Sequence, residues 1–330
     1  MYRHHELIHR LADGRFHSGQ ELGRLLGITR SSVWKKLQQI KQSYDLEIDA
    51  VSGRGYRLRE PLDLLNQQSI LELLRAEGLA PLPLLVLHPS IESTNSWLMK
   101  QAASGAESGT VCLAEQQIAG KGRHGRTWIS PFGRNIYLSM LWRFEEPPMQ
   151  LAGLSLASAI AVLRLLHQMN CDQAGLKWPN DVLWQGKKLA GLLLEVAGEA
   201  GGPSLVVIGV GLNTRLGSHG EVIDQPWVDL NNIPNVLPYT RNQLVSKLIR
   251  HLRIVIGEYQ TGGLESFIEE WHEHDQLLGK QVVIRGHSQE HAGVHLGIDG
   301  NGAIRLHSEG KERSFHAGEV SLRQTVDEES

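Results

Sequence analysis

Apolar residues in the first sixty positions recur at helical spacing and then give way to short apolar runs. The pattern predicts three helices and two short strands, at residues 6–12, 19–26, 30–44, 46–51 and 56–59. Ser18 is a plausible helix N-cap, and Glu21 follows at capping-box spacing. The glycine turn 27–29 joins two of the helices, which indicates a helix-turn-helix from Ser18 to Leu37 with a hairpin wing beside it.

The rest of the chain first mixes helical and strand patterns and then changes to strands alone. Helices are predicted at 68–77, 96–103, 152–169, 241–259 and 264–274, and strands at 82–87, 110–115, 135–142, 181–184, 188–195 and 205–212. From Gly279 onward, short strands are predicted at 281–285, 291–298, 303–306, 313–316 and 320–323, with a hairpin turn at 299–302. Residues 326–330 are expected to form a frayed acidic tail.

These elements predict an α+β protein of three domains. We expect a winged helix-turn-helix at 1–62, a central α/β domain with a mixed sheet at 66–275, and a small β-barrel at 276–330. A chain of 330 residues is long enough for several domains and a sizeable core.

Charge is distributed unevenly along the chain. Residues 1–60 hold eleven Lys and Arg against seven Asp and Glu, which leaves +4 there and −7 in the remainder of a chain of net charge −3. A basic amino-terminal unit is a hint of nucleic-acid binding. The candidate DNA-binding residues are those expected on the exposed side of the helix at 30–44, the second of the helix-turn-helix, and at the wing tip: Arg30, Ser31, Ser32, Lys35, Lys36 and Arg54. A helical dimerisation domain is the alternative.

The small number of cysteines and the short apolar runs indicate in which cellular compartment the protein is expected. Cys112 and Cys171 are the two cysteines, so no disulfide framework is expected and a reducing compartment is favoured. The first residues lack the apolar core of a signal peptide, and the longest apolar run, 151–163, is too short to span a bilayer. We therefore expect a cytoplasmic protein with no membrane partner.

The most distinctive stretch is GKGRHGRTW at 120–128. It combines three glycines with the cations Lys121, Arg123 and Arg126, and it contains no acidic residue. Glycine lets the backbone approach a ligand closely, and the arginine fork suits phosphate and carboxylate oxygens. The loop is suited to a polyphosphate or a phosphoryl-like transition state; a solvated surface loop is the alternative.

Gly120, Gly122 and Gly125 also match the dinucleotide pattern G-x-G-x-x-G. That interpretation needs a helix directly after the motif. Residues 129–133 break the chain, and the next apolar run is typical of a strand. We therefore expect a glycine-rich loop between two strands and not a Rossmann site.

Three other stretches carry candidate chemistry. The residues at 93–95 precede a helix, where they are either simple caps or donors to a ligand. The run KWPND at 177–181 brings a cation and a carboxylate close together. Lys188 begins an apolar strand, where its side chain extends either to solvent or into a site.

The histidine clusters do not predict a metal site. His272 lies near His274, and His287 lies near His291 and His295, but neither set comes with cysteines. Their spacing does not converge on one point, so solvated surface is expected.

Taken together, the motifs resemble the bifunctional biotin protein ligases and biotin operon repressors of bacteria. The resemblance covers essentially the whole chain. It rests on the winged helix and on ESTNSW (92–97), AEQQIAGKGRHGRTWISPFGRNIYLSM (114–140), KWPNDV (177–182), KKLAGLLLE (187–195) and GVGLN (209–213). It implies a central domain of the biotinyl and lipoyl ligase type and an SH3-like C-terminal barrel.

The resemblance also implies an activity and its partners. Biotin and ATP, with Mg²⁺, would give biotinyl-5′-AMP and pyrophosphate. Biotin would then pass to a lysine of the biotin carboxyl carrier protein of acetyl-CoA carboxylase. The adenylate-bound homodimer, formed by pairing sheet edges, would bind operator DNA and repress the biotin biosynthesis genes.

Roles for single residues follow from the same resemblance. The implied biotin-binding residues are Ser93, Thr94, Asn95, Gln117, Lys121, Gly122, Arg123 and Lys188. The implied ATP or adenylate residues are Lys121, Arg123, Arg126, Asn213 and Trp227, with Trp227 closing a loop over adenine. The implied catalytic residues are Arg123, Lys188, Asp181 and Lys177, and Asp181 is the candidate for handling the acceptor lysine or the Mg²⁺ ion.

The chain departs from the family pattern at three loop positions. Lys121 stands where arginine is usual and keeps the charge without the bidentate fork. Ile118 and His124 replace residues that are often polar or basic, and the loop before Trp227 differs in composition. Two rival functions remain. A lipoate–protein ligase would share the fold and the activation chemistry but typically lacks the winged helix. A pure ligand-sensing repressor would keep the winged helix and the pocket but needs no catalytic loop.

Overall fold

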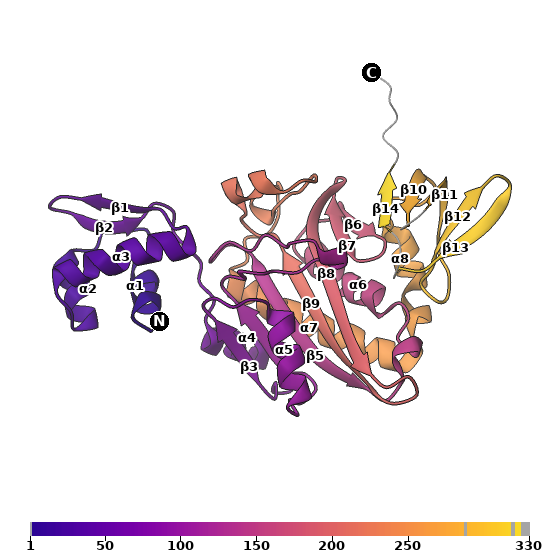
Figure 1. The fold of residues 1–330 in the computed structure, drawn as a ribbon, viewed down its shortest axis with the longest axis horizontal. Coiled ribbons are helices and arrows are strands. Elements are labelled where there is room, and N and C mark those ends of the chain that lie inside the picture. The colour runs from indigo at the N-terminus through magenta and orange to yellow at the C-terminus, as the bar shows by residue number, and fades with distance from the viewer. Residues whose placement is uncertain (1, 287–288, 318–320, 325–330) are drawn as a thin grey trace, which may run out of the picture.

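The computed structural model describes residues 2–286, 289–317 and 321–324 and arranges three units in a row (Figure 1). The winged helix lies at one end, a seven-stranded sheet lies in the middle and a five-stranded sheet lies at the other end. The predicted α+β class is confirmed. His287, the first position of the predicted strand 320–323 and the acidic tail lie outside the described residues.

The amino-terminal unit forms the predicted winged helix. Its elements are α1 (Tyr2–Leu11), α2 (Gly19–Leu26), α3 (Arg30–Tyr44), β1 (Ile48–Val51) and β2 (Gly55–Leu58). Ser18 and Thr29 cap α2 and α3, because each side-chain oxygen accepts a hydrogen bond from the backbone N–H three residues on. The Glu21 carboxylate pairs with Arg10 at 2.7 Å and does not complete a capping box. The caps fix both helix starts, which is why these bounds could be predicted.

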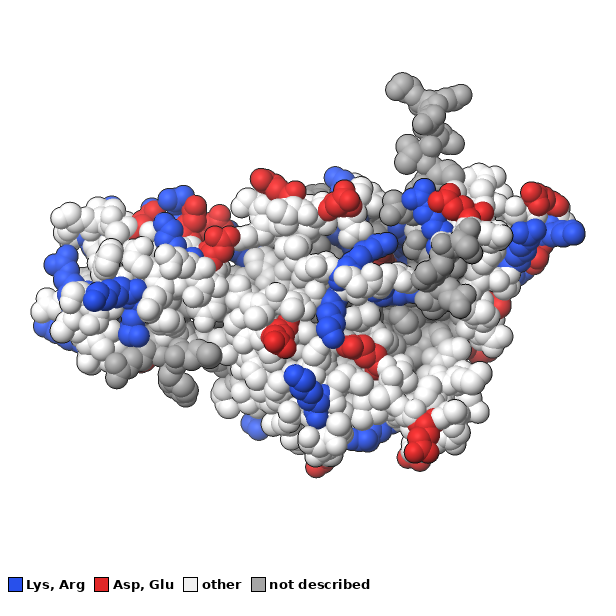
Figure 2. All heavy atoms as spheres, viewed as in Figure 1, with Lys and Arg blue, Asp and Glu red and all other residues white. Residues whose placement is uncertain are grey.

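Basic side chains are spread over the helices of this unit. On the face that Figure 2 shows, Lys and Arg side chains lie over the winged helix, and its Asp and Glu side chains gather on the side of the wing. The wing acids pair with wing arginines: Asp49 contacts Arg57 at 3.0 Å and Arg59 at 3.3 Å. The positive charge that is not paired with a nearby carboxylate therefore lies more on the helices than on the wing strands.

The central sheet is mixed, as predicted. It has the order β3-β4-β5-β9-β8-β7-β6, and the strands are β3 (Leu85–His88), β4 (Val111–Ala114), β5 (Ile136–Phe144), β6 (Ala174–Lys177), β7 (Asp181–Trp184), β8 (Lys187–Gly198) and β9 (Ser204–Leu212). Only the β3–β4 pair is parallel among these neighbours. Strand β6 was not predicted, because four residues that end in a lysine give too short a pattern. Strands β4 and β5 pair antiparallel with no α-helix between them, which excludes the Rossmann arrangement.

Helices cover both faces of the central sheet. They are α4 (Gln67–Ala76), α5 (Thr94–Ala103), α6 (Leu154–Gln168), α7 (Arg241–Gly262) and α8 (Ile268–His274). Helices α6 and α7 lie behind the sheet in Figure 1 and α5 lies in front. Strand β5 alternates accordingly: Ile136 and Met140 join the cluster on the α6 side, whereas Leu141 packs with α5. Within the described residues, no helix has the length and apolar character needed to cross a bilayer.

The C-terminal unit is an antiparallel sheet of β10 (Gln281–Arg285), β11 (Glu290–Ile298), β12 (Ile304–Ser308), β13 (Lys311–Phe315) and β14 (Ser321–Gln324), in the order β13-β12-β11-β10-β14. Its strands match the predicted series of short strands. Val282, Ile284 and Ile304 belong to the same buried cluster as the central sheet. The unit therefore shares its core with the central one.

The prediction of a solvated surface is wrong for His295. Its side chain is fully buried, with Nε2 only 2.6 Å from Asp275 Oδ2. The Gly297 N–H donates to the other ring nitrogen of His295, and the Ile298 N–H donates to His272 Nε2. These histidines attach β11 to the end of α8, so their role here is in packing.

A buried ion pair joins the linker to three other segments of the chain. Arg241, the first residue of α7, contacts Glu115 at 2.7 Å, and both side chains are almost completely buried. The same guanidinium donates to the backbone carbonyls of Asp63 and Asn135. Glu115 in turn accepts a hydrogen bond from the backbone N–H of Leu65. The pair therefore fixes the linker, the end of β4, the start of β5 and the start of α7 relative to one another.

Phe132 belongs to the central unit by sequence but packs into the winged helix. Its side chain is 1 % exposed and lies in the cluster that holds α1, α2 and α3 together. The ring centroids of Phe132 and Tyr44 are 4.5 Å apart. Nearby, Arg134 forms an ion pair with Glu60. The winged helix is therefore attached by a buried aromatic contact as well as by the linker.

We predict that Arg241→Met destabilises the protein by about 3–5 kcal/mol, because it leaves the Glu115 carboxylate buried without its cation. Urea unfolding measures the change. Arg305→Met is the matched control: it removes the exposed 2.8 Å pair with Glu312 and should leave the unfolding midpoint unchanged. The double variant Arg241→Met/Glu115→Gln should recover part of the loss. An unchanged midpoint in Arg241→Met would contradict the role assigned to the pair.

Candidate active site

A cavity of about 1020 Å³ opens over the α5 side of the central sheet. Its walls come from the glycine-rich loop, the start of α5, the β6–β7 connection, β8, β9 and the loop after β9. All the residues predicted to bind biotin or ATP, or to act in catalysis, line it: Ser93, Thr94, Asn95, Gln117, Lys121, Gly122, Arg123, Arg126, Lys177, Asp181, Lys188, Asn213 and Trp227. Residues more than one hundred positions apart therefore meet in one site.

The glycine-rich loop is a preformed hairpin over this cavity. Lys121 bridges Thr127 in antiparallel register, and the Gly122 N–H donates to the Arg126 carbonyl at 2.7 Å. The tip is the short turn η1 (Arg123–Gly125), where His124 has a φ of 53° and Gly125 a φ of 72°. Glycine adopts this left-handed conformation without strain, and histidine adopts it more readily than most residues.

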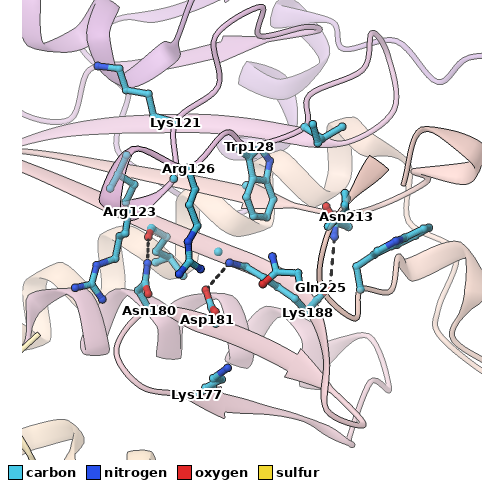
Figure 3. Close-up of a pocket in the computed structure, with 18 of the residues that line it drawn as sticks. Lys121, Arg123, Arg126, Trp128, Lys177, Asn180, Asp181, Lys188, Asn213 and Gln225 are labelled. Atoms are coloured by element: carbon cyan, nitrogen blue, oxygen red, sulfur yellow. Dashed lines mark hydrogen bonds and ion pairs between the residues drawn. The ribbon is translucent and has the colours of Figure 1, made fainter. Parts of the chain in front are cut away.

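The cations of the hairpin point in different directions (Figure 3). Lys121 is half exposed and lies 3.8 Å from Glu195 of β8, away from the centre of the cavity. Arg123 donates to the backbone carbonyl of Ala317 in the C-terminal unit. Burial lowers the pKa of the Arg123 guanidinium, and the nearby Asp181 carboxylate opposes that shift. Arg126 extends toward Asp181. The sequence could not indicate these directions.

Lys188 and Asp181 form the ion pair at the floor of the site. Lys188 Nζ lies 2.7 Å from Asp181 Oδ1, and both side chains are largely buried. The alternative of a solvent-facing Lys188 is therefore excluded. Lys177 and Asp181 are paired across the β6–β7 hairpin, whose turn contains a cis Trp178–Pro179 bond. Asp181 is therefore the cross-strand neighbour of one lysine, Lys177, and the ion-pair partner of another, Lys188.

The C-terminal unit supports this turn from behind. The Trp178 indole N–H donates to the Gly302 carbonyl at 3.0 Å, and its side chain is 1 % exposed. On the other side, Asn180 exchanges backbone and side-chain hydrogen bonds with Leu192 of β8. Contacts on both sides therefore hold the KWPND run in place.

The start of α5 supplies a buried polar network. Ser93 is the N-cap, and the next two side chains are buried in the cavity wall, so capping and the site use neighbouring residues. Gln117 Oε1 accepts from the backbone N–H of Thr94 at 2.9 Å. The Ser139 hydroxyl lies 2.7 Å from Thr94 Oγ1 and 2.6 Å from Asn95 Oδ1. Ser139 was missed in the sequence, because no local signal links a strand serine to a distant helix.

Glycines of β8 and β9 form the floor of the cavity. A Cβ on Gly211 would lie 2.4 Å from the Trp128 ring, and one on Gly209 would lie 2.2 Å from Asn95 Oδ1. A Cβ on Gly191 would meet both Lys188 and Trp128 at 3.0 Å. The pattern Gly-Val-Gly places the two β9 glycines on one face of the strand, because strand side chains alternate. The spacing of two between Gly209 and Gly211 was the sequence signal that other side chains approach this face of β9 closely.

Trp128 is a second residue that the sequence left without a role. Its ring lies over Gly211, and Lys188 Nζ is 5.3 Å from the ring centroid. The indole N–H is buried without a hydrogen-bond partner in the described part of the chain. The aromatic face beside a lysine suits a flat or apolar group of a ligand.

The proposed DNA face lies outside this cavity. Arg30, Ser31 and Lys35 are exposed on α3, whereas Ser32 and Lys36 are partly buried. The guanidinium of Arg54 at the wing tip stacks on Phe16, with its carbon 4.2 Å from the ring centroid. A helix and a wing tip therefore present cations from the same unit, as a winged helix that binds DNA requires.

Comparison with known proteins places the chain in a family. Residues 87–213 match the Biotin/lipoate A/B protein ligase family, residues 3–57 match an HTH domain and residues 277–323 match the Biotin protein ligase C terminal domain. The chain is 38 % identical over 319 residues to the bifunctional ligase/repressor BirA of Escherichia coli, and the match covers 96 % of both proteins. The chain belongs to the family of bifunctional biotin protein ligases and repressors.

Other members of the biotin protein ligase family extend the comparison. The biotin–[acetyl-CoA-carboxylase] ligase of Mycobacterium tuberculosis is 35 % identical over 270 residues, which cover 80 % of this chain and 97 % of that protein. The biotin protein ligase from Aquifex aeolicus in complex with biotin and ATP is similar in structure, with a TM-score of 0.64 and 25 % identity. The match covers 74 % of this chain and 100 % of that one. The fold that was expected from the resemblance is confirmed.

We predict that Gly211→Ala displaces the Trp128 ring and destabilises the protein by about 1–3 kcal/mol, the usual cost of overpacking. Tryptophan quenching by acrylamide should increase, and trypsin should cut the 120–128 hairpin faster. Gly201→Ala, in the β8–β9 turn where a Cβ meets nothing within 4 Å, is the matched control. Equal cleavage rates in the two variants would show that Trp128 does not depend on Gly211.

Proposed function

We propose that this chain activates biotin with ATP and transfers it to a lysine of a biotin carboxyl carrier protein. In the first step, the biotin carboxylate attacks the α-phosphorus of ATP, which forms biotinyl-5′-AMP and releases pyrophosphate. In the second step, the acceptor amine attacks the acyl carbon and AMP leaves. The single observation that carries the proposal is the Lys188–Asp181 pair at the floor of a cavity that the basic glycine-rich hairpin covers.

The first step needs cations more than it needs a base. The carboxylate is already ionised, and its approach to a triphosphate brings two anions together. Lys188 and Arg126 would offset that repulsion and stabilise the charge that develops on the α-phosphate, and Arg123 would join them once it leaves its contact with the Ala317 carbonyl. Lys121 points to Glu195 in this structure, so its part in phosphate binding requires a turn of its side chain. The polar network of Ser93, Thr94, Asn95 and Gln117 is suited to the ureido group of biotin.

The second step needs a neutral acceptor amine. Asp181 pairs with Lys188 and lies opposite Lys177 in the β6–β7 hairpin, so it is placed to accept a proton from an incoming lysine. The 120–128 hairpin is placed to shield the acyl-adenylate from water during the transfer.

Magnesium enters this scheme together with ATP. The described residues contain no group of three or more His, Cys, Asp or Glu side chains able to hold a metal ion. We therefore treat the ion as part of the Mg·ATP substrate, which the phosphates coordinate, with Asp181 as the candidate protein contact.

We predict biotin-dependent exchange between ATP and pyrophosphate, and no exchange with lipoate. Lys188→Met should lower the rate about 10²–10³-fold, the usual cost of removing one fixed group that stabilises transition-state charge. Lys187→Met removes the exposed neighbouring lysine and should not change the rate. Exchange with lipoate alone would show that the chain is a lipoate–protein ligase. No exchange with either acid, in folded protein with magnesium, would leave a ligand-sensing DNA-binding protein.

We propose that the adenylate-bound form dimerises and binds operator DNA of the biotin biosynthesis genes. Strand β8 continues beyond its pairing with β7, which ends at Gly191, and only β9 pairs with its last residues in the described structure. Val196 on this free edge is 44 % exposed. A second copy that pairs along this edge would bring two winged helices to one palindromic site.

The division of labour follows the three predicted units. We propose that residues 1–62 bind DNA, residues 66–275 carry the chemistry and residues 276–330 support the KWPND turn and the hairpin. We also propose the cytoplasm as the place of action, since ATP, the carrier protein and the operator are found there. The free cysteines suit that compartment: both are buried, and burial raises the pKa of Cys112 to about 12.

We predict that Val196→Asp prevents dimerisation of the adenylate-bound protein and weakens operator binding, because it places charges against each other along the paired edge. Sedimentation velocity and DNA titration measure the two effects. Lys35→Ala should weaken DNA binding alone and reduce its salt dependence. Normal operator binding by a Val196→Asp monomer would rule out the proposed edge.

A further inference from the structure

Arg54 at the tip of the wing differs from the other wing arginines in its electrostatic surroundings. Arg57 and Arg59 both pair with Asp49, at 3.0 Å and 3.3 Å. Arg54 forms no ion pair with any residue that the structure describes. The tip of the wing therefore presents a positive charge that no carboxylate neutralises.

The wing tip is slender and its backbone is fixed. Val51 and Gly55 are the last paired residues of β1 and β2, so residues 52–54 form the turn between the strands. The Arg54 N–H donates to the Val51 carbonyl at 3.1 Å. The glycines on either side of Arg54 have φ values of 77° and 106°, which glycine adopts without strain. Both neighbours of Arg54 lack a side chain, so its guanidinium extends from a narrow turn.

The Phe16 ring holds the Arg54 guanidinium in place. The central carbon of this guanidinium lies 4.2 Å from the ring centroid, and that of Arg57 lies 4.7 Å from it. An aromatic face attracts a cation without neutralising its charge. Arg54 therefore loses part of its rotamer freedom before DNA arrives and keeps its charge for a partner.

The segment that carries Phe16 is attached to both the wing and the helices. The His17 N–H donates to the Tyr56 carbonyl at 2.8 Å, and the Tyr56 N–H donates to the His17 carbonyl at 2.9 Å. The buried His17 ring lies 3.0 Å from an Asp13 oxygen at one nitrogen and 3.1 Å from a Glu21 oxygen at the other. These contacts fix the position of Phe16 relative to the strand that follows the wing tip.

A narrow turn with one planar cation suits the minor groove of DNA. This groove is only about 6 Å wide, so it excludes a helix and admits an extended arginine. Where A·T base pairs narrow it further, its negative potential increases and attracts arginine. Helix α3 of the same unit presents Arg30 and Lys35 at its surface, where they suit the major groove. The helix and the wing tip can therefore occupy adjacent grooves of one duplex.

We propose that Arg54, held by Phe16, enters the minor groove beside each operator half-site and makes the protein prefer A·T base pairs there. This inference rests on the proposed binding of operator DNA. Arg54 responds to the width and potential of the groove, so the preference arises at base pairs that α3 does not contact. Phe16 is a positioning residue, because it acts through Arg54.

The first test changes the base pairs that flank the half-sites, once footprinting of the operator has located them. Wild-type protein with biotin and ATP is titrated with duplexes whose flanks are A·T, G·C or inosine·cytosine. Inosine·cytosine lacks the minor-groove amino group of G·C and keeps its major-groove edge. The A·T and inosine·cytosine duplexes should bind about fivefold more tightly than the G·C duplex, the low end of the cost of a wrong base pair.

Two results of this titration would overturn the proposal. Equal affinities for the three duplexes would show that the flanks are not read. Tighter binding of the A·T duplex alone would place the readout in the major groove, because inosine·cytosine resembles G·C there.

Arg54→Lys distinguishes the minor groove from the phosphates. Lysine keeps the charge and loses the planar guanidinium, so the salt dependence of binding should stay the same and the A·T preference should disappear. Phe16→Leu should also remove the preference, because the leucine side chain has no aromatic face. Arg24→Ala, which removes an exposed cation of α2, is the matched control and should keep the full preference. A full preference in Arg54→Lys would indicate a phosphate contact and overturn the proposal.

A double-mutant cycle tests whether Phe16 acts through Arg54. In an Arg54→Ala background, Phe16→Leu should leave the ratio of the affinities for the A·T and G·C duplexes unchanged. A further change in that ratio, or a lower melting temperature with weaker binding of every duplex, would overturn the positioning role of Phe16. If the wild-type chain binds none of the duplexes, the proposed repressor function fails, whereas binding without a flank preference contradicts this inference alone.

Discussion

The buried pair between Arg241 and Glu115 is the contact on which the geometry of the site depends. It fixes the end of β4 and the start of β5, and the glycine-rich hairpin connects those two ends. Glu115 lies two residues before Gln117, and Asn135 both accepts from Arg241 and directs the 214–229 loop. One buried guanidinium therefore sets the roots of both loops that cover the cavity. Removing either partner of a pair buried this completely would leave an uncompensated charge, so the site depends on a costly and specific arrangement of partners.

The cavity itself follows from the alternation of strand side chains. Strands β5, β8 and β9 present large apolar groups toward α6 and α7, and β8 and β9 present Gly191, Gly209 and Gly211 toward the cavity. The same strands therefore build a tight core on one side and an open floor on the other. Most of the cations are supplied by loops at the rim, where they can move without disturbing the core.

Local signals in the sequence were enough to predict most helices and strands and the residues that line the cavity. Ser18 and Thr29 determine the starts of α2 and α3 because helix caps act over three residues. The motifs also indicated which residues meet in the cavity. The partner of each side chain could not be predicted: Lys121 with Glu195, Arg123 with Ala317, and His295 with Asp275 join positions far apart in the chain or in different units. Such pairings depend on the tertiary fold, and a polar residue looks the same in sequence whether it is exposed or buried with a partner.

Phe132 makes the DNA-binding unit and the central unit depend on each other. Its ring fills the core of the DNA-binding unit, although its backbone belongs to the connection between the glycine-rich hairpin and β5. Deleting residues 1–62 would expose this ring on the surface of the enzyme that remains, and exposed apolar patches favour aggregation. The two units are therefore not independent bodies on a string: removing one of them uncovers a side chain that belongs to the other.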